Sequence, residues 1–252
     1  MLTVTKDRPL VTTTAGGLPR PPWFTANLDG RPFSVAMADR AYREQYQDAL
    51  ATYVVDQSRA GIDILVDGDA RLDDGFAGRH WISYVAERLS GMSPPELRDY
   101  PIHRGKKPGE IMYEVMETRM PCTVTGPVHR NRLEYDQVWK TCQAMTDRPV
   151  KLGGISAQLV ESSLNNSFYR DRRELVMDLS AALNDEYHAL ADAGCPVIQV
   201  EEPCIHGIAG TVKDAMLSPE FYVEAFNREV RGVCAKTELW CHTCWGSPAA
   251  QR

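Results

Sequence analysis

The chain has 252 residues, 43% of them hydrophobic and 25% charged, a balance that is ordinary for a globular protein with one large core. Its formal net charge of -6 argues against nucleic acid or an anionic membrane as a partner, and we expect neither a transmembrane segment nor a signal peptide at residues 1–7. Seven scattered cysteines suit a reducing compartment, so we expect a cytoplasmic enzyme.

Short apolar strands alternate with helical stretches along the chain. Six strands are predicted, over Leu10–Thr14, Ile62–Val66, Thr118–Thr125, Val150–Ile155, Pro196–Val200 and Ala235–Trp240. Apolar residues recur at helical spacing over residues 41–61, 134–146 and 171–193, and Ser218-Pro219-Glu220 predicts a further helix start. This alternation indicates a parallel sheet with crossover helices.

Polar or glycine residues follow the predicted strands directly, at Gly16, Asp69, Gly126, Glu201 and His242. In a (β/α)8 barrel these strand ends together form the active-site face. No G-x-G-x-x-G motif follows the first strand, which disfavours a doubly wound open sheet. We therefore predict an α/β fold of the (β/α)8 TIM-barrel type. Only about six βα units are present, so we expect residues 1–252 to form one barrel domain that is truncated at its C-terminus.

Two carboxylates at the predicted strand ends are candidates for binding. Asp69 follows the second strand and Glu201 ends the fifth. Carboxylates at a barrel mouth can bind a substrate ammonium group, coordinate a metal or transfer protons. Such acids can also cap a helix or pair with a nearby cation, Arg71, Arg79 or Lys151, and we favour that structural role for Asp67. For Asp69 and Glu201 we favour a functional role.

The segment from Trp240 to Gly246 contains a candidate metal motif. Side chains alternate along a strand, so His242 and Cys244 are predicted to face one way and Cys241 the other. Imidazole and thiolate are zinc ligands, but two ligands do not complete a site. A Cys-x-x-Cys redox pair and buried structural cysteines are alternatives that the spacing leaves open.

Taken together, these residues resemble the catalytic domain of cobalamin-independent methionine synthase and its wider family of zinc-dependent thiol alkyltransferases. The matching segments, in family order, are residues 12–19, 61–69, 148–151, 197–203 and 242–244. The resemblance implies a barrel with zinc held by an H-x-C pair, matched by His242 and Cys244, and by two later ligands beyond Arg252. It also implies that Asp69 and Glu201 hold the amino group of homocysteine.

Three departures from the family pattern concern the substrates. Gly17, in the first-strand turn that touches the amino-acid substrate, stands where the family usually has Ser. Glu201 stands where the methionine synthases usually carry Asp. Residues 154–163 contain no Trp to stack on a folate, which weakens methyl-folate as the donor.

The expected function is zinc-dependent transfer of a methyl or other alkyl group to a substrate thiol, as in methionine biosynthesis. The expected partners are a small-molecule thiol and an alkyl donor, and a homo-oligomer is left open. One alternative is epoxide opening by a zinc-bound thiolate, as in the epoxyalkane:coenzyme M transferases. A second alternative is an inactive or binding barrel remnant.

Overall fold

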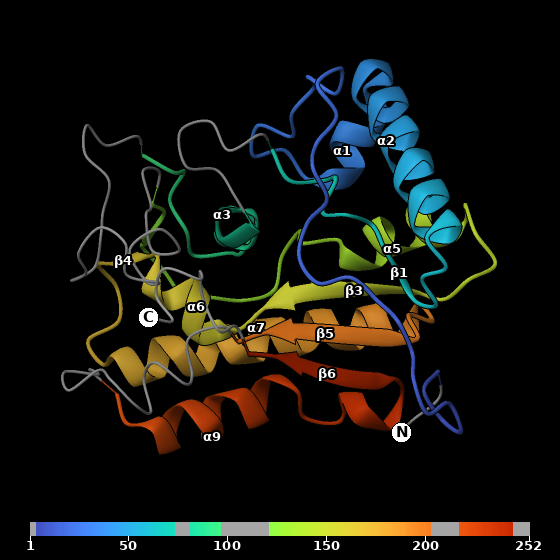
Figure 1. The fold of residues 1–252 in the computed structure, drawn as a ribbon. Helices are drawn as coiled ribbons and strands as arrows, with labels where there is room; N and C mark the ends of the chain where they lie inside the picture. Colours follow the sequence, from blue (N-terminus) through green and yellow to red (C-terminus); the bar gives the residue numbers. More distant parts are fainter. Residues whose placement is uncertain (1–3, 74–80, 97–120, 203–216, 244–252) are drawn as a thin grey trace, which may run out of the picture.

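The computed structural model describes residues 4–73, 81–96, 121–202 and 217–243 (Figure 1). The strands are β1 (Leu65–Val66), β2 (Thr123–Val124), β3 (Val150–Ile155), β4 (Asn165–Asn166), β5 (Val197–Glu201) and β6 (Glu238–His242). The helices are α1 (Phe33–Ala38), α2 (Arg40–Arg59), α3 (Trp81–Ala86), α5 (Tyr135–Gln143), α6 (Ala157–Ser162), α7 (Arg172–Asp192), α9 (Pro219–Glu229) and the 3-10 helix η2 (Val233–Ala235). In the described part of the chain, no helix has the length and apolar character needed to cross a membrane.

The central sheet has four parallel strands in the order β1-β3-β5-β6 (Figure 1). The strand register aligns Ile155 with Glu201, and Glu201 with His242. The carboxyl ends of β3, β5 and β6 therefore meet at one edge of the sheet. Within the described ranges the sheet does not close into a barrel.

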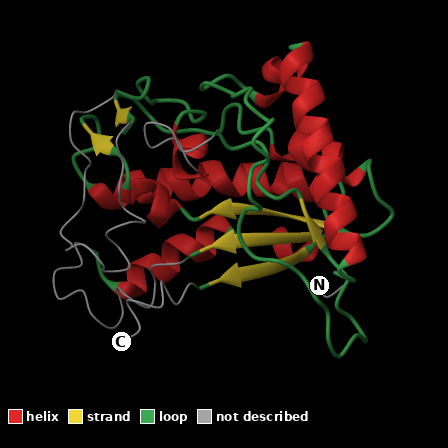
Figure 2. Ribbon diagram, turned by 45° about the horizontal axis from the view of Figure 1, so that its top comes forward, coloured by secondary structure: helices red, strands yellow, loops and turns green. Residues whose placement is uncertain are grey.

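One face of the sheet packs against helices. Leu152 and Ile198 on the strands share a hydrophobic cluster with Leu179 and Leu183 of α7. The long helix α7 packs against α5, α6 and α9, and it runs alongside the strands (Figures 1 and 2). Asp171 is the N-cap of α7, and its side chain accepts a hydrogen bond from the Arg173 amide. The opposite face of the sheet lines a pocket.

A glycine allows β3 to approach the helix layer closely. A Cβ atom on Gly154 would lie 2.5 Å from the Tyr187 hydroxyl and 3.0 Å from the Tyr135 ring. The Tyr187 hydroxyl uses this proximity to donate a hydrogen bond to the Ile155 carbonyl, at 3.2 Å. Any larger residue at 154 would push α5 or α7 away from the strand.

Most of the predicted elements are confirmed. Strand β3 has the predicted bounds, Val150–Ile155, and β5 and β6 lie within a few residues of their predicted positions. Helix α9 begins at Pro219 with Ser218 as its N-cap, as its sequence predicts. Helix α2 corresponds to the pattern over residues 41–61.

Three predicted strands differ from expectation. Of the strand predicted over Ile62–Val66, only Leu65–Val66 forms a strand, β1. The segment Leu10–Thr14 makes only one bridge, between Thr13 and Ile64, because the Thr12 amide donates to the Asp63 carboxylate instead of to a ladder. Of the strand predicted over Thr118–Thr125, residues 118–120 lie outside the described ranges. The remainder, β2, pairs with β4 in a separate parallel sheet.

The local contacts of β2 explain its separation from the central sheet. The Thr123 amide donates to the Ser93 hydroxyl at 3.0 Å, and the Thr125 amide donates to the Gly91 carbonyl at 2.8 Å. The segment at 91–93 thus occupies the backbone groups that a central strand would offer to its neighbours.

Candidate functional site

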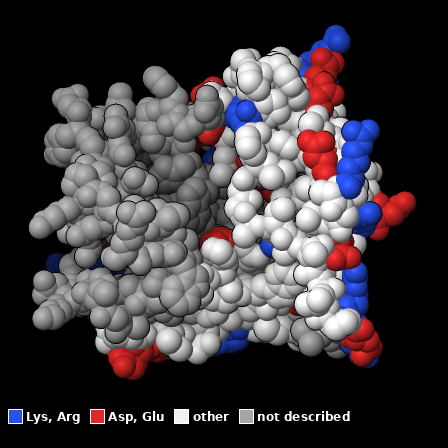
Figure 3. All heavy atoms as spheres, viewed as in Figure 1, with Lys and Arg blue, Asp and Glu red and all other residues white. Residues whose placement is uncertain are grey.

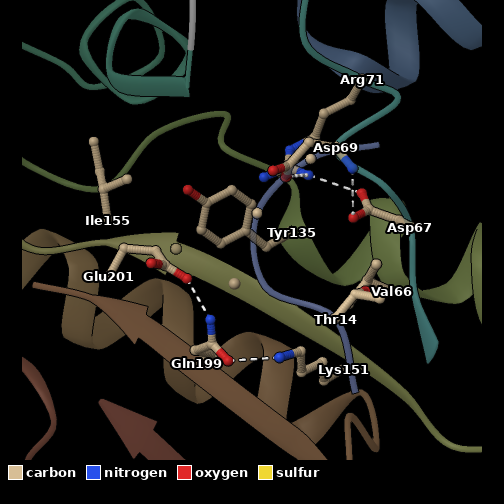
Figure 4. Close-up of a pocket in the computed structure, with 14 residues that line it drawn as sticks. Thr14, Val66, Asp67, Asp69, Arg71, Tyr135, Lys151, Ile155, Gln199 and Glu201 are labelled. Carbon is tan, nitrogen blue, oxygen red and sulfur yellow. Dashed lines mark hydrogen bonds and ion pairs between the residues drawn. The ribbon is translucent and has the colours of Figure 1, made fainter. Parts of the chain in front are cut away.

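The face of the sheet opposite α7 lines a cavity of about 180 Å³ near the strand ends (Figure 4). Its charged lining residues are Asp67, Asp69, Arg71, Lys151 and Glu201. It also contacts the first-strand turn at Gly16 and Gly17, the start of α5, and residues of β3 and β5. The structure therefore brings Gly17, Asp69 and Glu201, three of the predicted site residues, to one pocket.

The turn after β1 holds Asp69 in an unusual backbone conformation. Gly68 and Asp69 both have positive φ angles, of 65° and 54°. Glycine is required at 68 because a Cβ atom there would lie 2.6 Å from the Tyr53 ring. The Asp69 amide donates to the Asp67 carboxylate at 3.1 Å, which fixes the turn. This geometry presents the Asp69 side chain to the pocket (Figure 4).

A buried guanidinium joins the two aspartates. Arg71 Nη1 lies 2.8 Å from Asp67 Oδ2 and 3.0 Å from Asp69 Oδ1. The side chains of Arg71 and Asp67 are each 4% exposed, whereas that of Asp69 is 32% exposed. Burial raises the pKa of Asp67, and the Arg71 charge opposes that shift. The structural role preferred for Asp67 agrees with this ion pair, and Asp69 shares the same cation.

Glu201, at the end of β5, forms the opposite wall of the pocket. It accepts a hydrogen bond from Gln199 Nε2, and Gln199 Oε1 in turn accepts one from Lys151 Nζ at 2.6 Å (Figure 4). Burial lowers the pKa of Lys151 to about 8, with Glu201 acting in the other direction. Burial also raises the pKa of Glu201, against the hydrogen bond from Gln199. Strand alternation places Gln199 and Glu201 on one face, and Lys151 was among the cations expected to pair with these acids, but its hydrogen bond to Gln199 was not predicted.

His242 lies beside this wall at the end of β6. Its Nε2 atom is 3.7 Å from Glu201 Oε2, and its side chain is 33% exposed. The imidazole is a chemically suitable zinc donor at the pocket edge. Cys244, its predicted partner, lies outside the described residues. Among the residues that are described, no three His, Cys, Asp or Glu side chains are grouped to hold a metal, so they supply one donor and not a complete zinc site.

Cys241 lies near acidic side chains. Burial raises the pKa of its thiol, and so do the charges of Glu202, Glu201 and Glu229. Reactive cysteines in redox motifs have lowered thiol pKa values. This environment argues against a redox role for the Cys241-x-x-Cys244 spacing.

A pair of buried carboxyl groups behind the sheet was not predicted. Glu202 is 2% exposed and Glu229 of α9 is 1% exposed. Glu229 Oε2 accepts the Ala157 amide, in the first turn of α6, at 2.9 Å. Burial raises the pKa of Glu202 to about 7 and raises that of Glu229 as well. Strand alternation places Glu202 opposite Glu201, which is the one sequence signal that indicates its position.

The buried Glu202 carboxyl group should make the free energy of unfolding depend on pH. The folded-state pKa of Glu202 exceeds its ordinary value of 4.5, so the folded protein binds this proton more tightly than the unfolded chain. The stabilisation is fully present below the ordinary pKa and is lost as the pH rises through the folded-state pKa of about 7. We expect a loss on the order of 3 kcal/mol.

The variant Glu202→Gln should remove this contribution. Urea unfolding of both proteins between pH 4 and pH 8 is the measurement, because the difference between the two curves cancels the groups that do not interact with Glu202. Glu229, whose pKa is raised by the Glu202 charge, contributes to the difference in the same direction. We expect the variant to gain stability relative to the parent protein as the pH rises. Curves that stay parallel over this interval would show that Glu202 does not titrate abnormally.

The charges outside the pocket form no single-sign patch on the face drawn in Figure 3. Acidic and basic side chains of the described residues are interspersed along one edge of the molecule.

Two solved structures resemble this fold. A B12-independent methionine synthase from Shewanella, in complex with selenomethionine, matches with a TM-score of 0.68 and 25% identity, over 95% of this chain and 63% of that chain. A Listeria monocytogenes structure matches with a TM-score of 0.66 and 16% identity, over 96% of this chain and 69% of that one. These likenesses and the parallel strand order define an α/β fold of the TIM-barrel type, as predicted.

The sequence comparisons identify the family. Residues 10–249 match the profile described as the catalytic domain of cobalamin-independent synthase. Methionine synthases from Sulfolobus acidocaldarius and Saccharolobus solfataricus are 30% and 29% identical, each over 94% of this chain. The chain belongs to the cobalamin-independent synthase catalytic-domain family, which confirms the predicted resemblance. It spans 62% and 63% of the length of these two relatives.

Proposed function

We propose that the protein transfers an alkyl group to the thiol of an amino-acid substrate, with homocysteine as the acceptor. The observation that carries this proposal is the pairing of two carboxylates across one small cavity. Asp69 and Glu201 come from the ends of different strands and both line the pocket. Two carboxylates facing one cavity favour a cationic ligand group, and the amino group of homocysteine supplies one.

The pocket cations bear on the alternative substrate. A sulfonate-bearing thiol, as used in epoxide opening, would need a cation that is available to bind it. Arg71 is engaged by Asp67 and Asp69, and Lys151 donates to Gln199. Both cations therefore already serve the pocket's own polar groups, and this arrangement favours an ammonium ligand over a sulfonate.

The proposed zinc ligands from this chain are His242 and Cys244. Zinc bound there would lower the pKa of the substrate thiol, so that a thiolate is present at neutral pH. The protein's own residues then have a positioning task. Asp69 and Glu201 hold the ammonium group, and the absence of a side chain on Gly17, packed against Asp69, keeps that side of the pocket open. The same proposal includes a transferase role in methionine biosynthesis, with a small-molecule alkyl donor as the second substrate.

Metal analysis of the native full-length protein tests the zinc assignment. We expect about one zinc per chain, lost in His242→Ala and retained in the control His129→Ala, which changes an exposed histidine away from β6. Zinc retained in full by His242→Ala would show that the ligand is wrongly assigned. Absence of zinc from the parent protein would contradict zinc dependence.

Turnover by the zinc-loaded full-length protein tests the substrates. Homocysteine with methyltetrahydrofolate is compared with coenzyme M and epoxypropane. We expect alkylation of homocysteine. Turnover of the second pair alone would contradict the proposal and favour epoxide opening. Homocysteine that binds without turnover would point to a donor other than methyl-folate, and a zinc-loaded protein that binds neither thiol would contradict the proposal.

A further inference from the structure

Lys151, Gln199 and Glu201 form a continuous hydrogen-bonded chain along the pocket side of the sheet (Figure 4). Gln199 and Glu201 are two residues apart on β5 and so share a face, while Lys151 comes from the neighbouring strand β3. Lys151 is 3% exposed and Gln199 is 7% exposed. The chain therefore runs from a buried ammonium to a carboxylate that reaches the pocket.

The chemistry of the two ends fixes the orientation of the amide between them. An ammonium group only donates hydrogen bonds and a carboxylate only accepts them. The Gln199 carbonyl must therefore face Lys151, and its NH2 group must face Glu201. The Lys151 ammonium is held in place on a second side, 5.2 Å from the centre of the Trp240 ring.

The two acidic walls of the pocket are consequently supported in different ways. Asp69 shares the full charge of the Arg71 guanidinium at 3.0 Å. Glu201 receives a neutral amide donor, and its cation, Lys151, is one side chain further away. Arg71 is shared with Asp67, and the His242 imidazole lies 3.7 Å from Glu201 Oε2, so the two acids differ in how each carboxylate is held in place.

We propose that Lys151 and Gln199 are positioning residues that hold the Glu201 carboxylate for recognition of the substrate's ammonium group. This inference rests on the proposed function in one respect, namely that the substrate carries an ammonium group. The hydrogen-bonded chain also limits where the carboxylate can lie, because a Glu side chain freed from Gln199 regains its rotamers.

The test compares two thiols of similar length that differ in the amino group. Binding of homocysteine and of 4-mercaptobutyrate to the zinc-loaded full-length protein is measured by calorimetry. In Gln199→Leu we expect homocysteine to bind about tenfold more weakly, because a Glu201 side chain released from Gln199 must be ordered again when the ligand binds. Binding of 4-mercaptobutyrate should not change. Lys151→Met should give the same pattern with a smaller loss, because the amide remains.

A matched control is Gln158→Leu, which changes a glutamine that is also 7% exposed but belongs to α6 and not to the pocket lining. We expect it to bind both thiols as the parent protein does. If Gln199→Leu does not fold, Gln199→Met, which keeps the unbranched side chain, takes its place. Equal weakening of both thiols, or of neither, would overturn the positioning role.

Failure of the proposed function would look different. A parent protein that binds both thiols equally does not recognise the ammonium group, whatever the role of Gln199. A crystal structure of Gln199→Leu then decides the positioning role by itself. A Glu201 carboxylate that is displaced or that adopts several conformations supports the positioning role, and an unmoved carboxylate overturns it.

Discussion

Replacement of Arg71 by methionine is expected to lower the free energy of unfolding by about 3–5 kcal/mol, because it leaves a buried carboxylate without its cation. The partner that remains is Asp67, whose side chain is 4% exposed. The guanidinium also lies 5.1 Å and 5.5 Å from the ring centres of Tyr84 and Tyr135, so its removal leaves a gap between them. Urea unfolding at neutral pH measures the loss.

Two further variants show whether the loss has the stated cause. Adding Asp67→Asn to Arg71→Met removes the unpaired charge, and we expect it to recover a large part of the stability. Arg40→Met breaks the exposed pair with Glu44 and should leave the unfolding midpoint almost unchanged. A double variant as unstable as Arg71→Met alone would show that packing, and not the buried charge, causes the loss.

Substitution of Glu201 by glutamine should have the largest effect on ligand binding. We expect the binding free energy of homocysteine to fall by about 2–5 kcal/mol, the usual cost of removing one partner of a partly buried charge pair. The same measurement on Asp69→Asn should show a smaller loss, since Arg71 already compensates part of the Asp69 charge. Calorimetric titration of the zinc-loaded full-length protein gives both values.

The control for this prediction is Glu44→Gln, which changes an exposed acid on α2 far from the pocket lining. It should bind homocysteine like the parent protein. An unchanged affinity in Glu201→Gln, with the fold intact, would remove Glu201 from the proposed binding site. A larger loss in Asp69→Asn than in Glu201→Gln would reverse the assigned order of the two acids.

Local chemistry explains which parts of the fold were predictable. The strand Val150–Ile155 lies between Pro149 and the N-cap Ser156, and these two adjacent residues predict where the strand begins and ends. It was predictable that Asp69 and Glu201 line one pocket, because parallel strands bring their carboxyl ends to one edge. Their assigned roles as ammonium ligands stay predictions, as do those of Gly17, His242 and Cys244.

The parts that the sequence did not reveal depend on contacts between distant segments. The bond from Lys151 to Gln199 requires the register of β3 against β5, which no local pattern encodes. The exclusion of β2 from the central sheet depends on backbone contacts with residues 91–93. Periodicity gives the face of a side chain, but it does not give the partner that the face meets.

The contact between Glu229 and the start of α6 has a consequence for the ligands that the fold can accept. In many α/β proteins the first turn of a helix that follows a strand binds a phosphate through its free amides. Here the Ala157 amide is already taken by Glu229, a fully buried carboxyl group from another helix. The protein thus satisfies this amide with its own side chain, and the Ala157 amide is not available to a phosphate group.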